Sequence, residues 1–180
     1  SLFRHRIELI PNCGHSIDYS LTTPWLKTYK RNPYPHTFMW EDYPMDGQRR
    51  QGFYNLYVMK RPKAADGLKD ASGEDRDYYE MDIQDNVIRL SVKKVTYQTL
   101  ERDPVYGIDL KFTKSYHPVI GGKWKIYLND QLVDMNRPVT VFINDRKAFE
   151  GKLVPRMEDM ITSCMEYFDP CRVFPASVDV

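Results

Sequence analysis

Apolar and polar side chains alternate with a period of two through much of the chain after Phe38. Four segments carry the pattern, with apolar residues at 88, 90 and 92, at 108, 110 and 112, at 124, 126 and 128, and at 139, 141 and 143. Strands of this kind bury one face and expose the other, as antiparallel sheets do. Turn-forming residues separate strands at 84–86 and 144–146. The pattern therefore predicts a mainly β chain with an antiparallel, Ig-like β-sandwich over residues 36–180.

The C-terminal part of this region adds one amphipathic helix and a last strand. Apolar residues fall at helical spacing over residues 156–167, and Asp169-Pro170 ends the pattern. We expect this methionine-rich stripe to close one end of the sandwich, with a partner groove as the alternative. Residues 173–180 then alternate as a strand, whereas the polar residues 62–77 lack periodicity and indicate a long surface loop.

Composition excludes several classes of function. The 180 residues include 26 Lys and Arg against 25 Asp and Glu, a net charge of +1 that offers no bulk attraction to nucleic acid or acidic membranes. No apolar stretch approaches the roughly 20 residues of a membrane-spanning helix. We therefore expect neither a nucleic-acid partner nor a membrane span.

The residues that could bind metals or form disulfides are sparse. Cys13, Cys164 and Cys171 are odd in number, which argues against a disulfide scaffold or a closed zinc site. We expect three free and mostly buried thiols, with a single Cys164–Cys171 bridge left open. Three histidines, His5, His36 and His117, have no partners at ligand spacing.

One predicted loop, at residues 129–136, is rich in side chains that carry oxygen. Asp130 and Asp134, with Asn129 and Asn136, could suggest calcium, but their spacing is not that of an EF-hand and ordinary turn chemistry explains them. No metal site and no cofactor is therefore expected.

The first 35 residues follow a different pattern. The stretch IELIPNCGHSIDY (7–19) suggests a short apolar strand at residues 6–10 and a loop that contains Gly14 and His15. Ser20, Thr22 or Thr23 can cap a following helix, Pro24 suits its first turn, and Asn32-Pro33 ends it. A strand, a Gly-His loop and a helix form an α/β unit, so we predict a boundary between residues 35 and 36.

This unit resembles the last strand, catalytic-histidine loop and final helix of α/β-hydrolases. The downstream residues resemble a β domain appended to the C-terminus of multidomain bacterial esterase- or peptidase-type hydrolases. That second resemblance rests mainly on LNDQLVDMNRPVTVFINDRKAFEGKL (128–153) and DPCRVFPASVDV (169–180).

The resemblance implies that His15 is the general base of a serine-hydrolase triad, since the histidine of that family follows its last strand. The chain contains no G-x-S-x-G nucleophile motif, and the matching acid would precede His15. We therefore expect a C-terminal piece of a longer enzyme, with no catalytic activity of its own. Its partner would be its own upstream catalytic domain, which it braces or shapes, and the resemblance favours a secreted or periplasmic location. A homo-oligomer remains open.

The aromatic residues suggest an alternative function. A set of tyrosines and tryptophans lies on or beside the predicted strands: Trp40, Tyr43, Tyr54, Tyr57, Tyr78, Tyr79, Trp124 and Tyr127. Coplanar exposed rings could bind glycans, which makes a carbohydrate-binding module the second hypothesis. We favour packing or domain contact, because aromatic residues commonly pack strands and interdomain faces.

The isolated chain should show no hydrolase activity. An imidazole without a nucleophile elbow and oxyanion donors has nothing to activate. Assays with p-nitrophenyl esters and peptide anilides, run beside a His15→Ala variant, test this. Turnover that disappears on that substitution would contradict the expectation.

Overall fold

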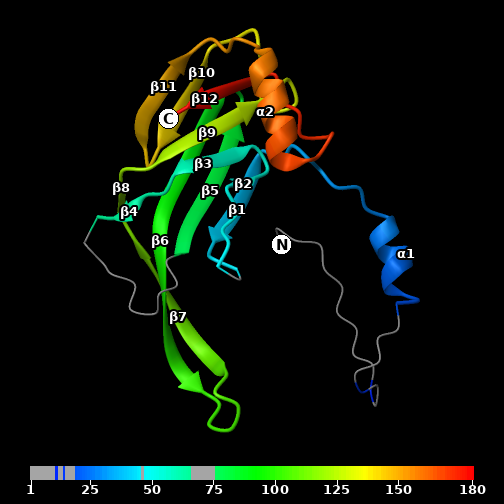
Figure 1. Cartoon of the computed structure of the whole chain (residues 1–180), viewed down its shortest axis with the longest axis vertical. Coiled ribbons are helices and arrows are strands. Elements are labelled where there is room, and N and C mark those ends of the chain that lie inside the picture. The colour runs from blue at the N-terminus through cyan, green and yellow to red at the C-terminus, as the bar shows by residue number, and fades with distance from the viewer. Residues whose placement is uncertain (1–10, 12–13, 15–18, 46, 66–75) are drawn as a thin grey trace. The chain divides into compact units, whose positions relative to one another are not determined.

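The computed structural model describes residues 11, 14, 19–45, 47–65 and 76–180 (Figure 1). Contacts along the chain divide it into two compact units, residues 1–32 and 33–180. The predicted strand at residues 6–10 and the loop residue His15 lie outside the described residues.

The first unit contains one described helix, α1 (Thr22–Lys27). This helix begins about where the sequence predicts, but Leu21 occupies the N-cap and makes no capping side-chain hydrogen bond. The prediction of a Ser20, Thr22 or Thr23 cap is therefore wrong. None of the side chains of α1 is buried.

Over residues 33–45, 47–65 and 76–180, the second unit contains three sheets and one helix. The six-stranded sheet comprises β1 (Thr37–Asp42), β5 (Arg76–Gln84), β6 (Val87–Arg102), β10 (Val139–Ile143), β11 (Arg146–Gly151) and β7 (Asp109–His117). The four-stranded sheet comprises β12 (Ala176–Asp179), β9 (Lys123–Leu128), β3 (Leu56–Lys60) and β2 (Gly52–Phe53). A small third sheet pairs β4 (Lys63–Ala64) with β8 (Val119–Ile120), and α2 (Met157–Tyr167) is the helix.

The core lies between the two larger sheets. Alternate residues of β6, namely Ile88, Leu90 and Val92, are buried with Trp124, Ile126 and Leu128 of β9 in one hydrophobic cluster. The prediction of a mainly β, sandwich-like fold with antiparallel sheets and one C-terminal helix is confirmed. One pair departs from the antiparallel pattern, because β10 runs parallel to β6.

Both predicted hairpin turns are present. Gln84 ends β5 and Val87 begins β6, and Asp85 adopts a positive φ between them. Asn144 and Asp145 both have positive φ between β10 and β11, the conformation that two-residue hairpin loops require. Of the predicted loop at 62–77, Lys63 and Ala64 form β4 and residues 66–75 lie outside the described residues.

Helix α2 has the predicted position but not the predicted orientation. It buries Asp159 and Ser163, whereas its apolar stripe is exposed, with Phe168 at its C-cap 90% exposed. The buried face makes polar contacts: Ser163 Oγ accepts from Phe174 N at 3.0 Å, and Ser177 Oγ donates to Asp159 Oδ1 at 2.7 Å. The expectation that the methionine stripe closes the sandwich is therefore wrong, because hydrogen bonds and aromatic packing hold the polar face instead.

A row of charges ends the inner face of the six-stranded sheet. Asp42, Asp77 and Lys94 stand opposite one another on β1, β5 and β6, next to the apolar row Trp40, Tyr79 and Val92. All three charged residues are buried.

Ion pairs compensate this charged row. The Asp77 carboxylate lies 2.7 Å from Lys94 Nζ and 3.0 Å from Arg61 Nη1. Arg61 also binds Asp42, and Arg49 lies 3.6 Å from Asp42 and 3.7 Å from Asp77. Burial raises the pKa of Asp42 even though both guanidinium groups oppose the shift. Because Arg61 follows β3, the network ties the two large sheets together.

Replacing Asp77 with Asn should lower the free energy of unfolding by about 3 kcal/mol, since removing one partner leaves buried cations uncompensated. Urea denaturation measures this change. The control is Asp109→Asn, which breaks the exposed pair with Arg102 and should have a far smaller effect. Equal losses in the two variants would contradict the role assigned to the network.

Candidate functional site

A two-stranded arm extends from the sandwich (Figure 1). Pairing between β5 and β6 ends at Arg76 and Val95, so β6 continues beyond Val95 with β7 as its strand partner. We call residues 96–116 the β6–β7 arm. A two-stranded hairpin is marginally stable by itself. Among the described residues no third strand pairs with the arm beyond Val95, so another interaction is needed to stabilise it.

The arm exposes apolar side chains along its length and at its tip. Tyr106 is 78% exposed, Leu100 64% and Phe112 58%. The exposed apolar residues of the arm are Tyr97, Leu100, Val105, Tyr106, Ile108, Leu110, Phe112 and Tyr116. The prediction that Ile108, Leu110 and Phe112 face a core is therefore wrong, because all three are exposed and no second sheet among the described residues covers this strand. Exposed apolar side chains gathered on one such element are typical of an interaction site.

The charged residues of the arm are largely paired within the chain. Arg102 Nε lies 2.8 Å from Asp109 Oδ1, and Lys111 Nζ lies 2.5 Å from Glu101 Oε2. Asp103 Oδ1 accepts hydrogen bonds at 2.8 Å from the backbone N–H groups of residues 105 and 106. The arm thus presents apolar side chains to a partner, with little charge left uncompensated.

A polar cluster on the outer face anchors the root of the arm. Glu41 of β1 accepts from Tyr97 Oη at 2.7 Å and from Arg76 Nη1 at 3.2 Å, and it also binds Lys114 Nζ. Burial would raise the pKa of Glu41, but the hydrogen bonds from Lys114 and Tyr97 outweigh it and hold this pKa below its ordinary value. Burial would likewise lower the pKa of Lys114, whereas Glu41 and Tyr97 raise it. The cluster therefore fixes the direction in which the arm leaves the sheet.

The aromatic rings at this root do not form a flat platform. The Lys114 ammonium lies 5.3 Å from the centres of the Tyr78 and Tyr116 rings and 5.6 Å from that of Tyr97. Tyr78 and Tyr116 meet at 66°, and Tyr97 and Phe112 at 65°, which are edge-to-face arrangements. The rings enclose a lysine of the chain itself instead of lying coplanar.

Other aromatic residues named from the sequence belong to the interior. Trp40, Tyr79, Trp124 and Tyr127 are buried. Tyr127 stacks on Phe174 and donates to Glu166 Oε2 of α2 at 2.7 Å. The predicted use of these residues in packing is therefore confirmed, and their burial leaves none of the four rings exposed for a glycan.

A second feature lies where two strands share one edge of β6. Strand β10 pairs with residues 87–90 of β6, and β7 begins to pair at Lys94, which leaves Val92 between them. The Asn144 side chain fills this break: its Oδ1 accepts from Val92 N at 2.7 Å, and its Nδ2 donates to Val92 O at 3.1 Å. The Asn144 amide thus makes the two hydrogen bonds that the backbone of a neighbouring strand would otherwise make to Val92. A hollow, which we call the notch, remains above this side chain.

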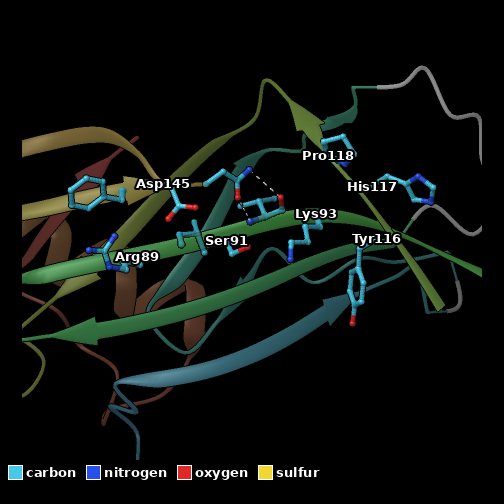
Figure 2. A pocket seen from close by; sticks show the side chains of 11 residues that line it. Arg89, Ser91, Lys93, Tyr116, His117, Pro118 and Asp145 are labelled. Atoms are coloured by element: carbon cyan, nitrogen blue, oxygen red, sulfur yellow. Dashed lines mark hydrogen bonds between the residues drawn. The ribbon is translucent and has the colours of Figure 1, made fainter.

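The notch is a pocket of about 490 Å³ (Figure 2). Arg89, Ser91 and Lys93 lie along β6 on its floor. The turn with Asn144 and Asp145 and the ring of Phe142 form one wall, and Tyr116, His117 and Pro118 form the other. Its volume is within the range of small-molecule sites.

The remaining predicted residues have structural contacts or lie outside the described residues. The histidine rings of His36 and His117 lie 2.9 Å from Gln131 O and from Thr96 Oγ1, respectively. In the oxygen-rich loop, Asn129 Oδ1 and Asp134 Oδ1 accept backbone hydrogen bonds two residues ahead, as turn residues do.

Two of the three cysteines are free, as expected, but exposed instead of buried. Cys164 and Cys171 are free, so the open alternative of a bridge between them is excluded. They are also exposed, so the expectation of burial is wrong for this pair, and Cys13 lies outside the described residues.

Comparison with protein-family models, curated proteins and solved structures gave no match. Within the described ranges, no helix is long and apolar enough to cross a membrane. The resemblance to α/β-hydrolases and the role of His15 therefore stay predictions.

Sequence reasoning missed both the arm and the notch. An uninterrupted strand signal from 87 to 102 is about three times the usual strand length, and it could have indicated an extension beyond the sandwich. No sequence pattern indicated the notch, because polar residues at 89, 91 and 93 are what any strand presents on its solvent-facing side.

Replacing Glu41 with Gln should loosen the arm. The loss of charge-assisted bonds from Lys114 and Arg76 should cost about 1 kcal/mol at neutral pH, allowing for partial solvent screening. Because the folded-state pKa of Glu41 is lowered, its contribution is present above the ordinary value near 4.5 and is lost as pH falls through the lowered pKa. The difference between Glu41→Gln and the parent should therefore disappear in acid.

Unfolding curves across pH measure this difference, and hydrogen exchange locates it. Arm amides should exchange faster in Glu41→Gln, whereas Glu150→Gln, a change at an exposed pair with Lys147, should leave them unchanged. Unaltered arm exchange in Glu41→Gln would contradict the anchoring role.

Proposed function

We propose that residues 33–180 form a non-catalytic accessory domain that docks its β6–β7 arm onto the catalytic domain of a serine hydrolase. The observation that carries the proposal is the exposed apolar surface of the arm, which no second sheet covers in the described part of the chain. Burying these side chains would supply roughly 25 cal/mol per Å² and would stabilise a hairpin that is marginal alone.

The chemistry of the arm specifies its partner. Internal pairing of Arg102 with Asp109 and of Lys111 with Glu101 leaves few charges for a partner to neutralise. A charged partner surface would lose its hydration against the apolar tip without gaining an ion pair. The docking surface should therefore be apolar and nearly uncharged, as an interdomain face of a globular protein is.

The sequence resemblance implies that this partner is a hydrolase domain. If His15 belongs to the last part of that domain, the same polypeptide tethers the accessory domain to it. A short tether gives a high effective concentration, and even a modest apolar surface then stays docked. Under this proposal, the accessory domain braces the catalytic domain and carries no triad residue of its own.

A carbohydrate-binding platform fits the outer face less well. Successive sugar rings need coplanar exposed aromatic rings, whereas Tyr78, Tyr97 and Tyr116 surround Lys114 at steep angles. The cluster is better explained as the anchor of the arm.

The test compares this chain with the polypeptide expressed from its native start codon. In the longer polypeptide, backbone amides of β7 and of β6 beyond Val95 should exchange at least tenfold more slowly than in residues 1–180. The double substitution Leu110→Ser and Phe112→Ser should abolish this protection and lower the unfolding temperature of the catalytic domain. The matched control is Met157→Ser with Met165→Ser, which removes similar apolar surface from α2.

Three results would contradict the proposal. One is an upstream sequence without G-x-S-x-G followed by an acid, and another is equal exchange of the arm in both polypeptides. The third is arm protection in the isolated chain that rises with protein concentration, because it would assign the arm to a homo-oligomer.

A further inference from the structure

The cations of the notch pocket are held in place by rings and not by carboxylates. The Arg89 guanidinium lies 4.7 Å from the centre of the Phe142 ring, and Lys93 Nζ lies 5.4 Å from that of Tyr116. Among the described residues, no carboxylate lies within ion-pair distance of either side chain. Their hydrogen-bond donors are therefore oriented and available at the two ends of the floor.

The charge around the pocket is nevertheless balanced. Asp145 stands on the wall, and Asp82 and Glu80 of β5 lie directly across from Arg89 and Ser91. One carboxylate therefore lines the pocket with the two cations, and two more flank it on β5, which offsets much of the positive charge that would attract an anion. The same cations make a cationic ligand unfavourable.

The pocket offers both donors and acceptors over an elongated floor. Arg89 and Lys93 donate, Asp145 accepts, and the Ser91 hydroxyl between them can do both. Residues 89 and 93 are four apart on one strand, which separates their Cα atoms by roughly 13 Å. A ligand that spans the floor therefore carries several groups that each donate and accept.

We propose that the notch pocket binds a neutral oligosaccharide. Sugar hydroxyls both donate and accept hydrogen bonds, as the side chains along this floor do. Arg89 and Asp145 hold neighbouring hydroxyls on one side, and Lys93 holds a hydroxyl of the next sugar unit. The site differs from an aromatic platform in that polar side chains select the ligand, and it is independent of the docking proposed for the arm.

Isothermal titration with cellotriose, maltotriose, xylotriose and triacetylchitotriose tests the proposal, with trigalacturonate as the anionic comparison. At least one neutral trisaccharide should bind saturably to the full chain. Asp145→Ala and Ser91→Ala should each weaken that binding about tenfold, the effect of losing one or two hydrogen bonds. The control Arg146→Ala alters the exposed neighbour of Asp145 outside the pocket and should leave the affinity unchanged.

Backbone amide shifts on titration should appear at residues 91–93 and 144–146, which places the sugar independently of the variants. Unfolding curves check that Asp145→Ala keeps its turn, and Ser91→Ala leaves that turn untouched. Failure of all four neutral sugars, binding of trigalacturonate alone, or full affinity in both pocket variants would overturn the proposal.

Discussion

The buried ion row of Asp42, Asp77 and Lys94 sets the limit of the sandwich. Two carboxylates stand opposite each other in register on β1 and β5, an arrangement that is unfavourable unless cations compensate it. Lys94 from the same sheet and Arg61 from the end of β3 supply that compensation at 2.7 and 3.0 Å from Asp77. Because the partners come from both large sheets, the network joins them where the apolar rows of the core stop. Inside this row the chain is an ordinary sandwich, and beyond it β6 continues as an arm.

This limit explains why the two faces of the six-stranded sheet have different roles. On the inner face, the charged residues of the row form ion pairs with one another and with arginines, and these pairs join the two large sheets. On the outer face, Glu41, the neighbour of Asp42 in sequence, reaches Tyr97 and Lys114 on the arm. Consecutive residues of a strand point to opposite faces, so two adjacent acids of β1 serve two networks, one inside and one outside. The position of the arm is thereby coupled to the end of the core.

The sequence was informative wherever short-range patterning decides the structure. Alternation located the buried residues of β6 and β9, and turn chemistry located the bends at 84–86 and 144–146, because both depend on neighbouring residues only. It failed where burial depends on a distant element. Periodicity shows that Leu110 and Phe112 share a face, but not whether a second sheet covers it. Helical spacing likewise identified α2 but not its buried face, because the hydrogen bonds of Asp159 and Ser163 come from residues 177 and 174.

Both candidate sites follow from the length of one strand. β6 is longer than the sheet that holds it, so its edge is shared between the parallel β10 and the antiparallel β7. Two separate strands pair with successive parts of this edge, and the gap between them leaves the backbone of Val92 to bond to a side chain, that of Asn144. The space above the Asn144 side chain is the pocket, and the part of β6 beyond it belongs to the arm. A shorter β6 that ended at Lys94 would have neither. The same argument explains why replacing Asn144 differs from replacing Asp145: the former removes the partner of a backbone edge, whereas the latter removes a ligand-facing acceptor and leaves that edge paired.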